Sequence, residues 1–293
     1  MATKTIAIIG LGLIGGSIAK ALYVQKSGFR VVAFDQDVKV LKKAEQMEII
    51  SSWSQDPAEI VKDADITIFC VPVCSIVPIC QEIAGALKKG SIVTDVGSVK
   101  GYLQEELKKI LLDDVTYIGA HPMAGSEKSG LDASDASLFA GRPFVLVKPE
   151  KQNEEALQQM VAFVKALRAY PVFMEPAAHD LTTAMVSHMP HVLSTALMLT
   201  AAKDEVTAGT KFLAAGCFRD MTRVSGADPR MWTDICLSNS YAIIEQMQKV
   251  EKLLDLAKEK ILQKDEAWLM EFFANGRAGR EHFGMFITDG KGE

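Results

Sequence analysis

The chain has 293 residues, of which 48% are hydrophobic and 24% are charged, and its formal net charge is −5. This composition is typical of a globular protein, the length allows two domains, and the acidic balance argues against a nucleic-acid surface. No apolar run approaches the roughly 20 residues that cross a bilayer, and the N-terminus lacks a signal-peptide core. Five cysteines without a Cys-x-x-Cys pair indicate reduced thiols. We therefore predict a cytoplasmic protein without membrane or nucleic-acid partners.

The first half of the chain alternates two kinds of segment. A helical pattern runs from about Leu13 to Lys26, and longer amphipathic stretches separate the apolar runs that follow. The expected strands cover residues 4–10, 29–35, 65–71, 91–97, 115–121, 143–148 and 170–175. Nearly continuous apolar strands that alternate with helices predict a parallel sheet covered on both faces.

After Pro176 the sequence changes character. Its pattern is helical almost throughout, and residues 231–263 carry apolar side chains at spacings of three and four. Pro190 predicts a kink or break in the first of these helices. We expect the glycine-rich tail from Gly276 onward to be irregular. The prediction is an α/β fold with a Rossmann-type dinucleotide-binding domain (1–175) and an all-helical domain for substrate binding and dimerisation (176–293).

A glycine-rich loop follows the first expected strand. Gly10, Gly12 and Gly15 form a G-x-G-x-x-G pattern at the start of a helix. The first glycine permits a tight turn, the second lets backbone approach a pyrophosphate, and the third lets helix and strand pack closely. The first helical residues, Leu13 and Ile14, then offer free N–H groups to the phosphates.

An acidic residue lies at the expected distance from this loop. Asp35 ends the second expected strand, 20 residues after Gly15, where a carboxylate accepts hydrogen bonds from the adenosine ribose. A carboxylate there repels a 2′-phosphate, and the stretch "DQDVK" has no arginine, so the sequence favours NAD over NADP. Val71 in "CVPV" lies at the end of the expected strand 65–71 and completes the expected cofactor contacts.

Three polar side chains follow other strand ends, where ligands of open α/β sheets bind. Ser98 either faces the nicotinamide or caps the next helix, and the two roles can coexist. Lys100 belongs to the first turn of that helix and is expected to be solvated or paired. His121 ends the strand 115–121, beside the expected nicotinamide, where a base would meet a substrate hydroxyl. The ordinary imidazole pKa suits a general base near neutrality.

The helical half contains four polar residues that its periodicity does not require, in "HDLTTAMVSHMPH": His179, Asp180, His188 and His191. His188 and His191 lie three apart around Pro190 and are expected to project in similar directions. No clear ligand set accompanies them, so we predict no metal site.

Two arginines in "GCFRDMTRVSGADPRMWTD" are candidates for binding an acidic substrate. Arg219 and Arg223 lie four residues apart, on one face if the segment is helical, and a guanidinium binds a carboxylate in bidentate fashion. The alternative is a surface ladder of ion pairs with Asp220, Asp228 and Asp234.

Several of these motifs together resemble one enzyme family. "GLGLIGGS", "DVGSVK", "HPMAGSE", "SHMPH" and "FRDMTRVSGADPRMW" occur in the order and at roughly the spacing of prephenate dehydrogenases and the related arogenate dehydrogenases of tyrosine biosynthesis. The resemblance extends from Lys4 to about Gln263. It implies an NAD-dependent oxidoreductase that catalyses an oxidative decarboxylation: hydride leaves C4 of the cyclohexadiene ring, CO2 leaves C1, and the ring becomes aromatic. Prephenate would give 4-hydroxyphenylpyruvate.

The resemblance also implies roles for site residues. His121 would hydrogen-bond the substrate's 4-hydroxyl, and Ser98 would contact that hydroxyl and the nicotinamide region. Arg223 would bind the ring carboxylate, and His191 would lie near the substrate side chain. The remaining expected substrate contacts come from the "GSE" motif: Ser126, and Glu127 in a polar network at the mouth of the site.

Three alternatives stay open on the sequence alone. Arogenate would serve as substrate in place of prephenate, since the two differ only in a group remote from C4. A β-hydroxyacid dehydrogenase would share the architecture, but it uses a lysine early in the helical domain, where this chain has none before Lys203. A non-catalytic, NAD-binding redox-sensing dimer is the alternative from another class. Relatives dimerise through the helical domain, so we expect a homodimer. We expect no regulatory ACT domain and no fused chorismate mutase.

Overall fold

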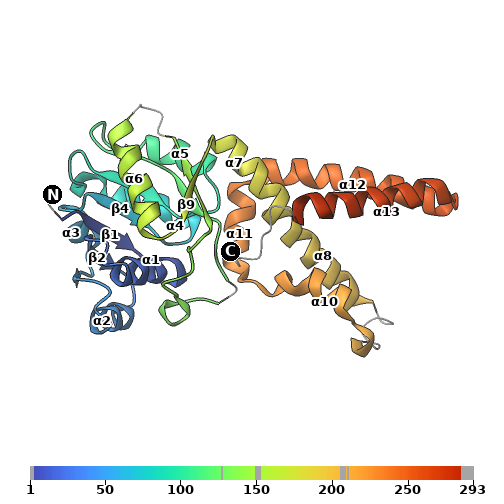
Figure 1. The fold of residues 1–293 in the computed structure, drawn as a ribbon, viewed down its shortest axis with the longest axis horizontal. Coiled ribbons are helices and arrows are strands. Elements are labelled where there is room, and N and C mark those ends of the chain that lie inside the picture. Colours follow the sequence, from blue (N-terminus) through green and yellow to red (C-terminus); the bar gives the residue numbers. More distant parts are fainter. Residues whose placement is uncertain (1–2, 127, 149–152, 205–208, 210, 285–293) are drawn as a thin grey trace. The chain divides into compact units, whose positions relative to one another are not determined.

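The structure is a computed structural model that describes residues 3–126, 128–148, 153–204, 209 and 211–284 (Figure 1). The chain forms two compact units, residues 1–242 and residues 243–293. The first unit contains both sheets and the helices up to α11. The predicted domain boundary after residue 175 stays a prediction.

A parallel six-stranded sheet forms the centre of the first unit, in the order β3-β2-β1-β4-β5-β6. This is the strand order of dinucleotide-binding Rossmann folds and confirms the predicted fold class. The strands are β1 (Thr5–Ile9), β2 (Arg30–Phe34), β3 (Ser52–Trp53), β4 (Ile66–Phe69), β5 (Ile92–Asp95) and β6 (Thr116–Tyr117). The short edge strand β3 was not expected from the sequence.

Both faces of this sheet are buried, because successive side chains of a strand point to opposite faces. In β1, Ile6 and Ile8 join one apolar core, and Ala7 and Ile9 join another. The helices that supply the first core are α1 (Leu13–Val24), α2 (Val38–Gln46) and α6 (Glu154–Ala166). Those that supply the second are α3 (Pro57–Val61), α4 (Val73–Ile83) and α5 (Gly101–Lys108).

The expected strand 115–121 is wrong in one respect. It divides after β6, and the second part, β7 (Ala120–Pro122), enters a separate three-stranded sheet. There β7 pairs antiparallel with β8 (Pro143–Val147), which pairs parallel with β9 (Tyr170–Met174). Gly119 lies at the division, where an added Cβ would lie 3.1 Å from the Tyr117 hydroxyl oxygen. His121 therefore belongs to a mixed sheet and not to the parallel one.

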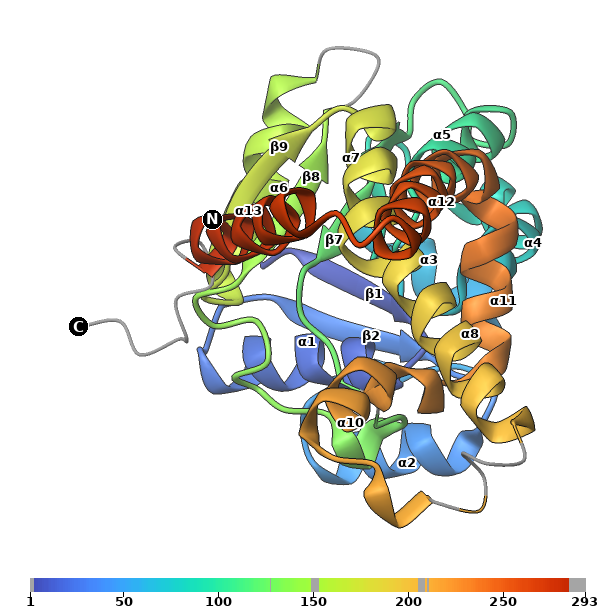
Figure 2. The same ribbon diagram turned by 90° about the vertical axis from the view of Figure 1, so that its right-hand side faces the viewer.

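The described residues after β9 form helices and the turns between them, as predicted. The helix α7 (Pro176–Thr183) continues through the π-helical turn η3 (Ala184–His188) into α8 (Met189–Lys203). Pro190 was expected to cause a kink or break; it lies in the first turn of α8, directly after the π-helical turn η3, and the helix is distorted there without a break. Figure 2 shows α8 beside α10 (Gly216–Thr222), and α8 also packs against the 3-10 turn η5 (Arg223–Gly226). The last helix of the first unit is α11 (Pro229–Ser238).

Two helices account for the described part of the second unit: α12 (Ser240–Leu262), which begins in the first unit, and α13 (Glu266–Gly284). The tail expected to be irregular is helical as far as Gly284, and the rest lies outside the described residues. Short 3-10 turns elsewhere are η1 (Ala84–Ala86), η2 (Leu131–Ala133) and η4 (Lys211–Leu213). Within the described ranges, no helix is long and apolar enough to cross a membrane.

Candidate active site

The glycine loop joins β1 to α1 with the geometry that its residues predict. Gly10 has φ +96°, and an added Cβ would lie 2.7 Å from the Cys70 carbonyl oxygen. A Cβ on Gly15 would lie 2.0 Å from the Gly10 carbonyl oxygen, so helix and strand require a glycine there. A Cβ on Gly12, in contrast, would meet no described atom within 4 Å. Nothing in the described chain itself demands glycine at position 12, which fits a backbone surface kept clear for a ligand.

The start of α1 also lacks a partner from the described protein. The neighbouring helices α2, α3 and α6 are each capped by a side chain, from Asp37, Asp56 and Asn153 respectively. No described side chain caps α1, so the first N–H groups, at Leu13 and Ile14, have no side-chain acceptor among the described residues. Such a helix start is a binding site for phosphate.

Asp35 lies at the end of β2, where the sequence places it. One carboxylate oxygen accepts the N–H of Leu11 at 2.8 Å, and the other accepts the N–H of Asp37 at 2.9 Å. The half-buried carboxylate thus stabilises the conformation of the glycine loop. Val71, after β4, contributes to the same loop, because its Cγ1 would lie 2.9 Å from a Cβ on Gly10. These residues fit the adenosine and phosphate parts of NAD.

Behind the site lies a buried polar cluster around Lys100. Its ammonium forms an ion pair with Asp95 and donates to the Ala120 carbonyl at 2.6 Å, and the Tyr117 hydroxyl donates to Asp95 at 2.7 Å. Burial, together with the Asp95 charge, raises the pKa of Tyr117, so its hydroxyl stays a donor. Of the two predicted states of Lys100, solvated or paired, the structure shows the paired one. The cluster ties β5 to the strand that carries His121.

The predicted helix cap at Ser98 is wrong. α5 begins at Gly101, with Lys100 at the capping position. The N–H groups of Lys100 and Gly101 donate instead to the two carboxylate oxygens of Asp180 on α7, each at 2.8 Å. Ser98 is half-buried, and its hydroxyl forms no hydrogen bond with a described residue. Its predicted contact with substrate and nicotinamide stays a prediction.

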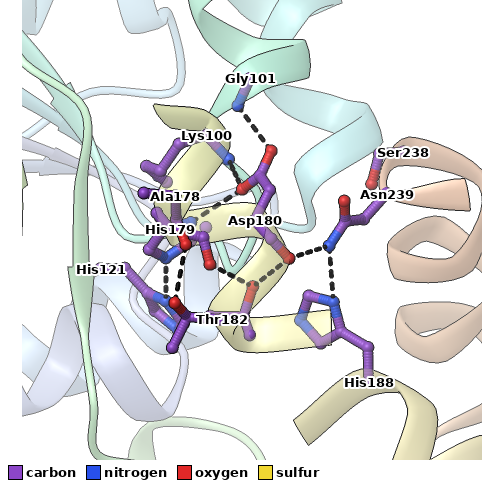
Figure 3. A network of polar contacts seen from close by, with 12 residues as sticks. Lys100, Gly101, His121, Ala178, His179, Asp180, Thr182, His188, Ser238 and Asn239 are labelled. Carbon is purple, nitrogen blue, oxygen red and sulfur yellow. Dashed lines mark hydrogen bonds and ion pairs between the residues drawn. The ribbon is translucent and has the colours of Figure 1, made fainter. Parts of the chain in front are cut away.

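His121 is the first member of a chain of hydrogen bonds (Figure 3). Its Nδ1 lies 2.9 Å from Nε2 of His179, whose Nδ1 lies 2.7 Å from Oδ1 of Asp180. Burial lowers the pKa of His121 well below the ordinary value, and His179 and the Lys100 charge add to this effect. The expectation of an ordinary imidazole pKa is therefore wrong, because the ring is buried. The neutral ring, whose Nε2 has no hydrogen-bond partner among the described residues, can still accept a proton there.

A second histidine of α7–α8 joins the same network. The Asn239 amide donates to the backbone carbonyl of Asp180 at 2.9 Å and to Nδ1 of His188 at 3.0 Å (Figure 3). His188 is 1% exposed, and burial lowers its pKa to about 4. Its Nε2 has no hydrogen-bond partner in the described chain.

Trp232 on α11 is in contact with the rings of two histidines of the site. His191 stacks on its ring with a centroid distance of 3.4 Å, and His188 meets it edge-on at 6.1 Å. This confirms that the two histidines project in similar directions. Arg223 is exposed in η5, close enough for its charge to help lower the pKa of His191, although burial contributes more. The contacts thus connect one cluster of site residues: His121, His188, Trp232, His191 and Arg223.

The two arginines belong to different elements, and whether they share a face stays a prediction. Arg219 lies in α10, whereas Arg223 begins η5 after that helix has ended. Neither guanidinium forms an ion pair with a described residue. The alternative ladder is also wrong for two of its acids: Asp228 caps α11, and Asp234 pairs with Arg230 at 3.3 Å.

The "GSE" residues are less informative. Ser126 is exposed and accepts the N–H of Lys128 at 3.2 Å, and no described contact joins it to His121. Glu127 lies outside the described residues. Within the described ranges, no three His, Cys, Asp or Glu side chains gather in a form that would hold a metal ion.

Sequence reasoning noted His179 and Asp180 without assigning them a function, and it missed Asn239 entirely. Asp180 reaches the start of α5 across 80 residues of sequence, a contact that no local pattern encodes. The available signal was an adjacent His–Asp pair in a helix that needs neither residue for packing.

The Rossmann sheet, the open glycine loop and the neutral histidine at the strand ends define a dinucleotide-dependent dehydrogenase. Sequence models describe two parts of one family. "Prephenate dehydrogenase, nucleotide-binding domain" matches residues 18–172, and "Prephenate dehydrogenase, dimerization domain" matches residues 175–275. The chain belongs to the prephenate dehydrogenase family, and it is an NAD-dependent oxidoreductase.

Individual relatives agree with this assignment. The prephenate dehydrogenase of Lactococcus lactis is 36% identical over 286 residues, covering 95% of this chain and 77% of its own. A crystal structure of prephenate dehydrogenase from A. aeolicus, in complex with hydroxyphenyl propionate and NAD+, matches with a TM-score of 0.89 at 28% identity, covering 97% and 99%. The Synechocystis arogenate dehydrogenase structure matches with a TM-score of 0.84 at 28% identity, covering 95% and 99%.

Proposed function

We propose that this chain oxidises prephenate with NAD and releases 4-hydroxyphenylpyruvate and CO2. The observation that carries the proposal is the His121 ring: burial keeps it neutral, its Nδ1 lies 2.9 Å from His179, and no described residue hydrogen-bonds its Nε2. The named activity of the relatives supports the same reaction.

The residues around the glycine loop fit NAD. The clear surface over Gly12, the uncapped start of α1 and the Asp35 carboxylate would hold its pyrophosphate and ribose. NAD, when bound, accepts the hydride that leaves C4 of the substrate. Asp35 repels a 2′-phosphate, so we propose NAD and not NADP as the cofactor.

The residues around Trp232 would orient the substrate. Arg223 binds the ring carboxylate through its planar guanidinium, and His191, fixed by stacking on Trp232, lies near the side chain. Ser98 and His121 receive the 4-hydroxyl. His121 takes the hydroxyl proton at Nε2 as hydride leaves C4, and aromatisation of the ring supplies the driving force for loss of CO2. The proton then returns from Nε2 to the phenolate oxygen, which gives the hydroxyl group of the product.

The dimeric state also belongs to this proposal. Apart from Ile243 and Gln246, the described side chains of α12 and α13 include none that is buried. A pair of helices that buries so little has no core of its own, and the matching family model describes a dimerization domain. We propose a homodimer formed through the helical part of the chain, in the cytoplasm.

Formation of NADH after addition of prephenate tests the function. We expect turnover with NAD that falls about a hundredfold to ten-thousandfold in His121→Ala, with NAD affinity nearly unchanged. Near-native turnover in this variant would show that His121 is not the base. Absence of NADH from the wild-type enzyme would remove the proposed reaction itself.

A second substrate has a specific observation behind it, the match to an arogenate dehydrogenase over 95% of this chain. Arogenate carries an amino group where prephenate carries a keto group, remote from C4. Side-by-side measurement of kcat/KM for both substrates on the purified enzyme decides between them. We expect the larger value for prephenate.

A further inference from the structure

The ring of His121 has two nitrogen atoms, and it can act as a base at Nε2 only if its proton sits on Nδ1. A neutral imidazole carries one donor and one acceptor, so a neighbour must choose between the two tautomers. The strand that carries His121 does not make this choice, because the partner of Nδ1 is His179 on α7, 58 residues away.

The hydrogen bonds around Asp180 determine the tautomer of His121 (Figure 3). Its Oδ1 accepts from the Lys100 N–H at 2.8 Å and faces Nδ1 of His179 at 2.7 Å, while Oδ2 accepts from the Gly101 N–H at 2.8 Å. A carboxylate with three donors around it accepts and does not donate. The His179 proton must therefore lie on Nδ1. This leaves Nε2 of His179 as an acceptor, so the proton of His121 lies on Nδ1 as well.

We propose that His179 and Asp180 are positioning residues, which hold His121 in the tautomer whose Nε2 is free to take the hydroxyl proton. The inference rests on the proposed function, because it takes His121 as the base. A carboxylate behind a base histidine also stabilises the imidazolium that forms, as in the Ser–His–Asp arrangement. Here a second imidazole carries that effect across one more hydrogen bond.

The same carboxylate fixes the start of α5. An added Cβ on Gly101 would lie 3.0 Å from Oδ2 of Asp180, so glycine at this position allows the close approach. The chain segment just before Gly101 carries Ser98. Asp180 therefore positions both the loop that carries Ser98 and, through His179, the ring of His121.

Histidine tautomers can be measured directly by NMR on protein labelled with ¹⁵N-histidine, without any substrate. The chain has five histidines, which keeps the spectrum simple. We expect a protonated Nδ1 and a free Nε2 in both His121 and His179. In His188, which accepts from Asn239 at Nδ1, we expect the opposite tautomer. A proton on Nε2 of His121 in the wild-type protein would overturn the inference, whatever the enzyme's activity.

Kinetic variants test the consequence. His179→Leu removes the acceptor that faces His121, whereas the side-chain oxygen of His179→Gln can still accept from Nδ1–H. We expect kcat to fall about a hundredfold or more in the leucine variant and no more than about tenfold in the glutamine variant. The KM for NAD should stay the same in both. Equal losses in the two variants would indicate a packing role and would contradict the inference.

Asp180→Asn should lower kcat by a similar factor to His179→Leu, since its amide group cannot accept all three N–H groups. Asp234→Asn is the matched control: that side chain is also buried and ion-paired, on α11, outside this network. We expect near-native kcat for the control. If His121→Ala abolishes turnover while His179→Leu and Asp180→Asn retain it, the positioning role fails and the proposed function stands. Retained turnover in His121→Ala would instead remove the proposed base.

Discussion

Arg223 is an exposed cation next to His191, and it forms no ion pair with the described part of the chain. If it binds the ring carboxylate, Arg223→Ala should weaken substrate binding by about 2–4 kcal/mol, because a charged hydrogen bond is lost. We expect a sharp rise in KM for prephenate and a smaller fall in kcat, since the carboxylate leaves as CO2 during the reaction. Lysine should rescue only part of the loss, because it lacks the planar fork.

Arg219 is the matched control for this measurement. It is also exposed and also lacks an ion pair with a described residue, but it lies in α10, before the turn that brings Arg223 to His191. Steady-state kinetics of Arg219→Ala should resemble the wild type. An unchanged KM in Arg223→Ala beside a raised KM in Arg219→Ala would reverse the assignment.

We expect His188 to make the folded protein sensitive to acid. Burial lowers its pKa to about 4, whereas the unfolded chain binds the same proton near 6.5. Between these values the unfolded state holds more protons, so the free energy of unfolding falls as the pH falls. The expected loss from this residue is on the order of 2 kcal/mol between pH 7 and pH 5.

Urea unfolding at the two pH values measures this loss. In His188→Asn the side-chain oxygen can still accept from Asn239, but no proton is bound, so the variant should lose less stability than the wild type on acidification. Protein concentration is held constant, because dimerisation contributes to apparent stability. Parallel losses in variant and wild type would show that other groups cause the acid sensitivity.

At the residue scale, site residues can be predicted from the sequence where they belong to a motif with a fixed spacing. Gly10, Gly12 and Gly15 follow from spacing, and Asp35 from its distance to the loop. The link from His121 through His179 to Asp180 is different. It depends on which element packs behind β7, a tertiary contact that no periodicity records.

At the scale of elements, two glycines of the same loop have different expected roles: Gly15 is needed for the fold, and Gly12 for the ligand. Gly12 has φ −69° and open space at its Cβ, so Gly12→Ala should change stability by no more than about 0.5 kcal/mol. The new methyl group would occupy the surface that approaches the pyrophosphate. We expect NAD affinity, measured by calorimetry, to fall about tenfold or more.

Gly15→Ala should show the converse behaviour. Its Cβ would lie 2.0 Å from the Gly10 carbonyl, so β1 and α1 must separate, at a cost of about 1–3 kcal/mol. Thermal unfolding of the two variants distinguishes them. Equal melting temperatures would refute the assignment of Gly15 to helix–strand packing.

The strands show where sequence patterns are sufficient and where they fail. β1, β2, β4 and β5 are buried and apolar and read as strands of a parallel sheet. The run 115–121 looks the same, but its second part pairs antiparallel with β8, which lies more than 20 residues later. Hydrophobicity reports burial and not the partner strand. For this reason the alternation predicted the Rossmann sheet and missed the second sheet that carries His121.

At the scale of the whole molecule, the helices α12 and α13 raise the question of what covers them. Large apolar side chains lie exposed along both, including Leu262 at 84%, Met270 at 70% and Phe273 at 69%. Soluble monomers rarely present so much apolar surface on adjacent helices. A second copy of the chain supplies a complementary surface, because a two-fold interface uses the same patch on both subunits.

We therefore expect twice the chain mass in sedimentation equilibrium at micromolar concentration. Replacing Met270 and Phe273 together by glutamate would bury charges in the proposed interface, which costs several kcal/mol, so the mass should shift toward the monomer. Glu271→Gln, an exposed change between them on α13, should leave the dimer intact. A wild-type chain that sediments as a monomer would refute the dimer. A double variant that stays dimeric would move the interface away from this face of α13.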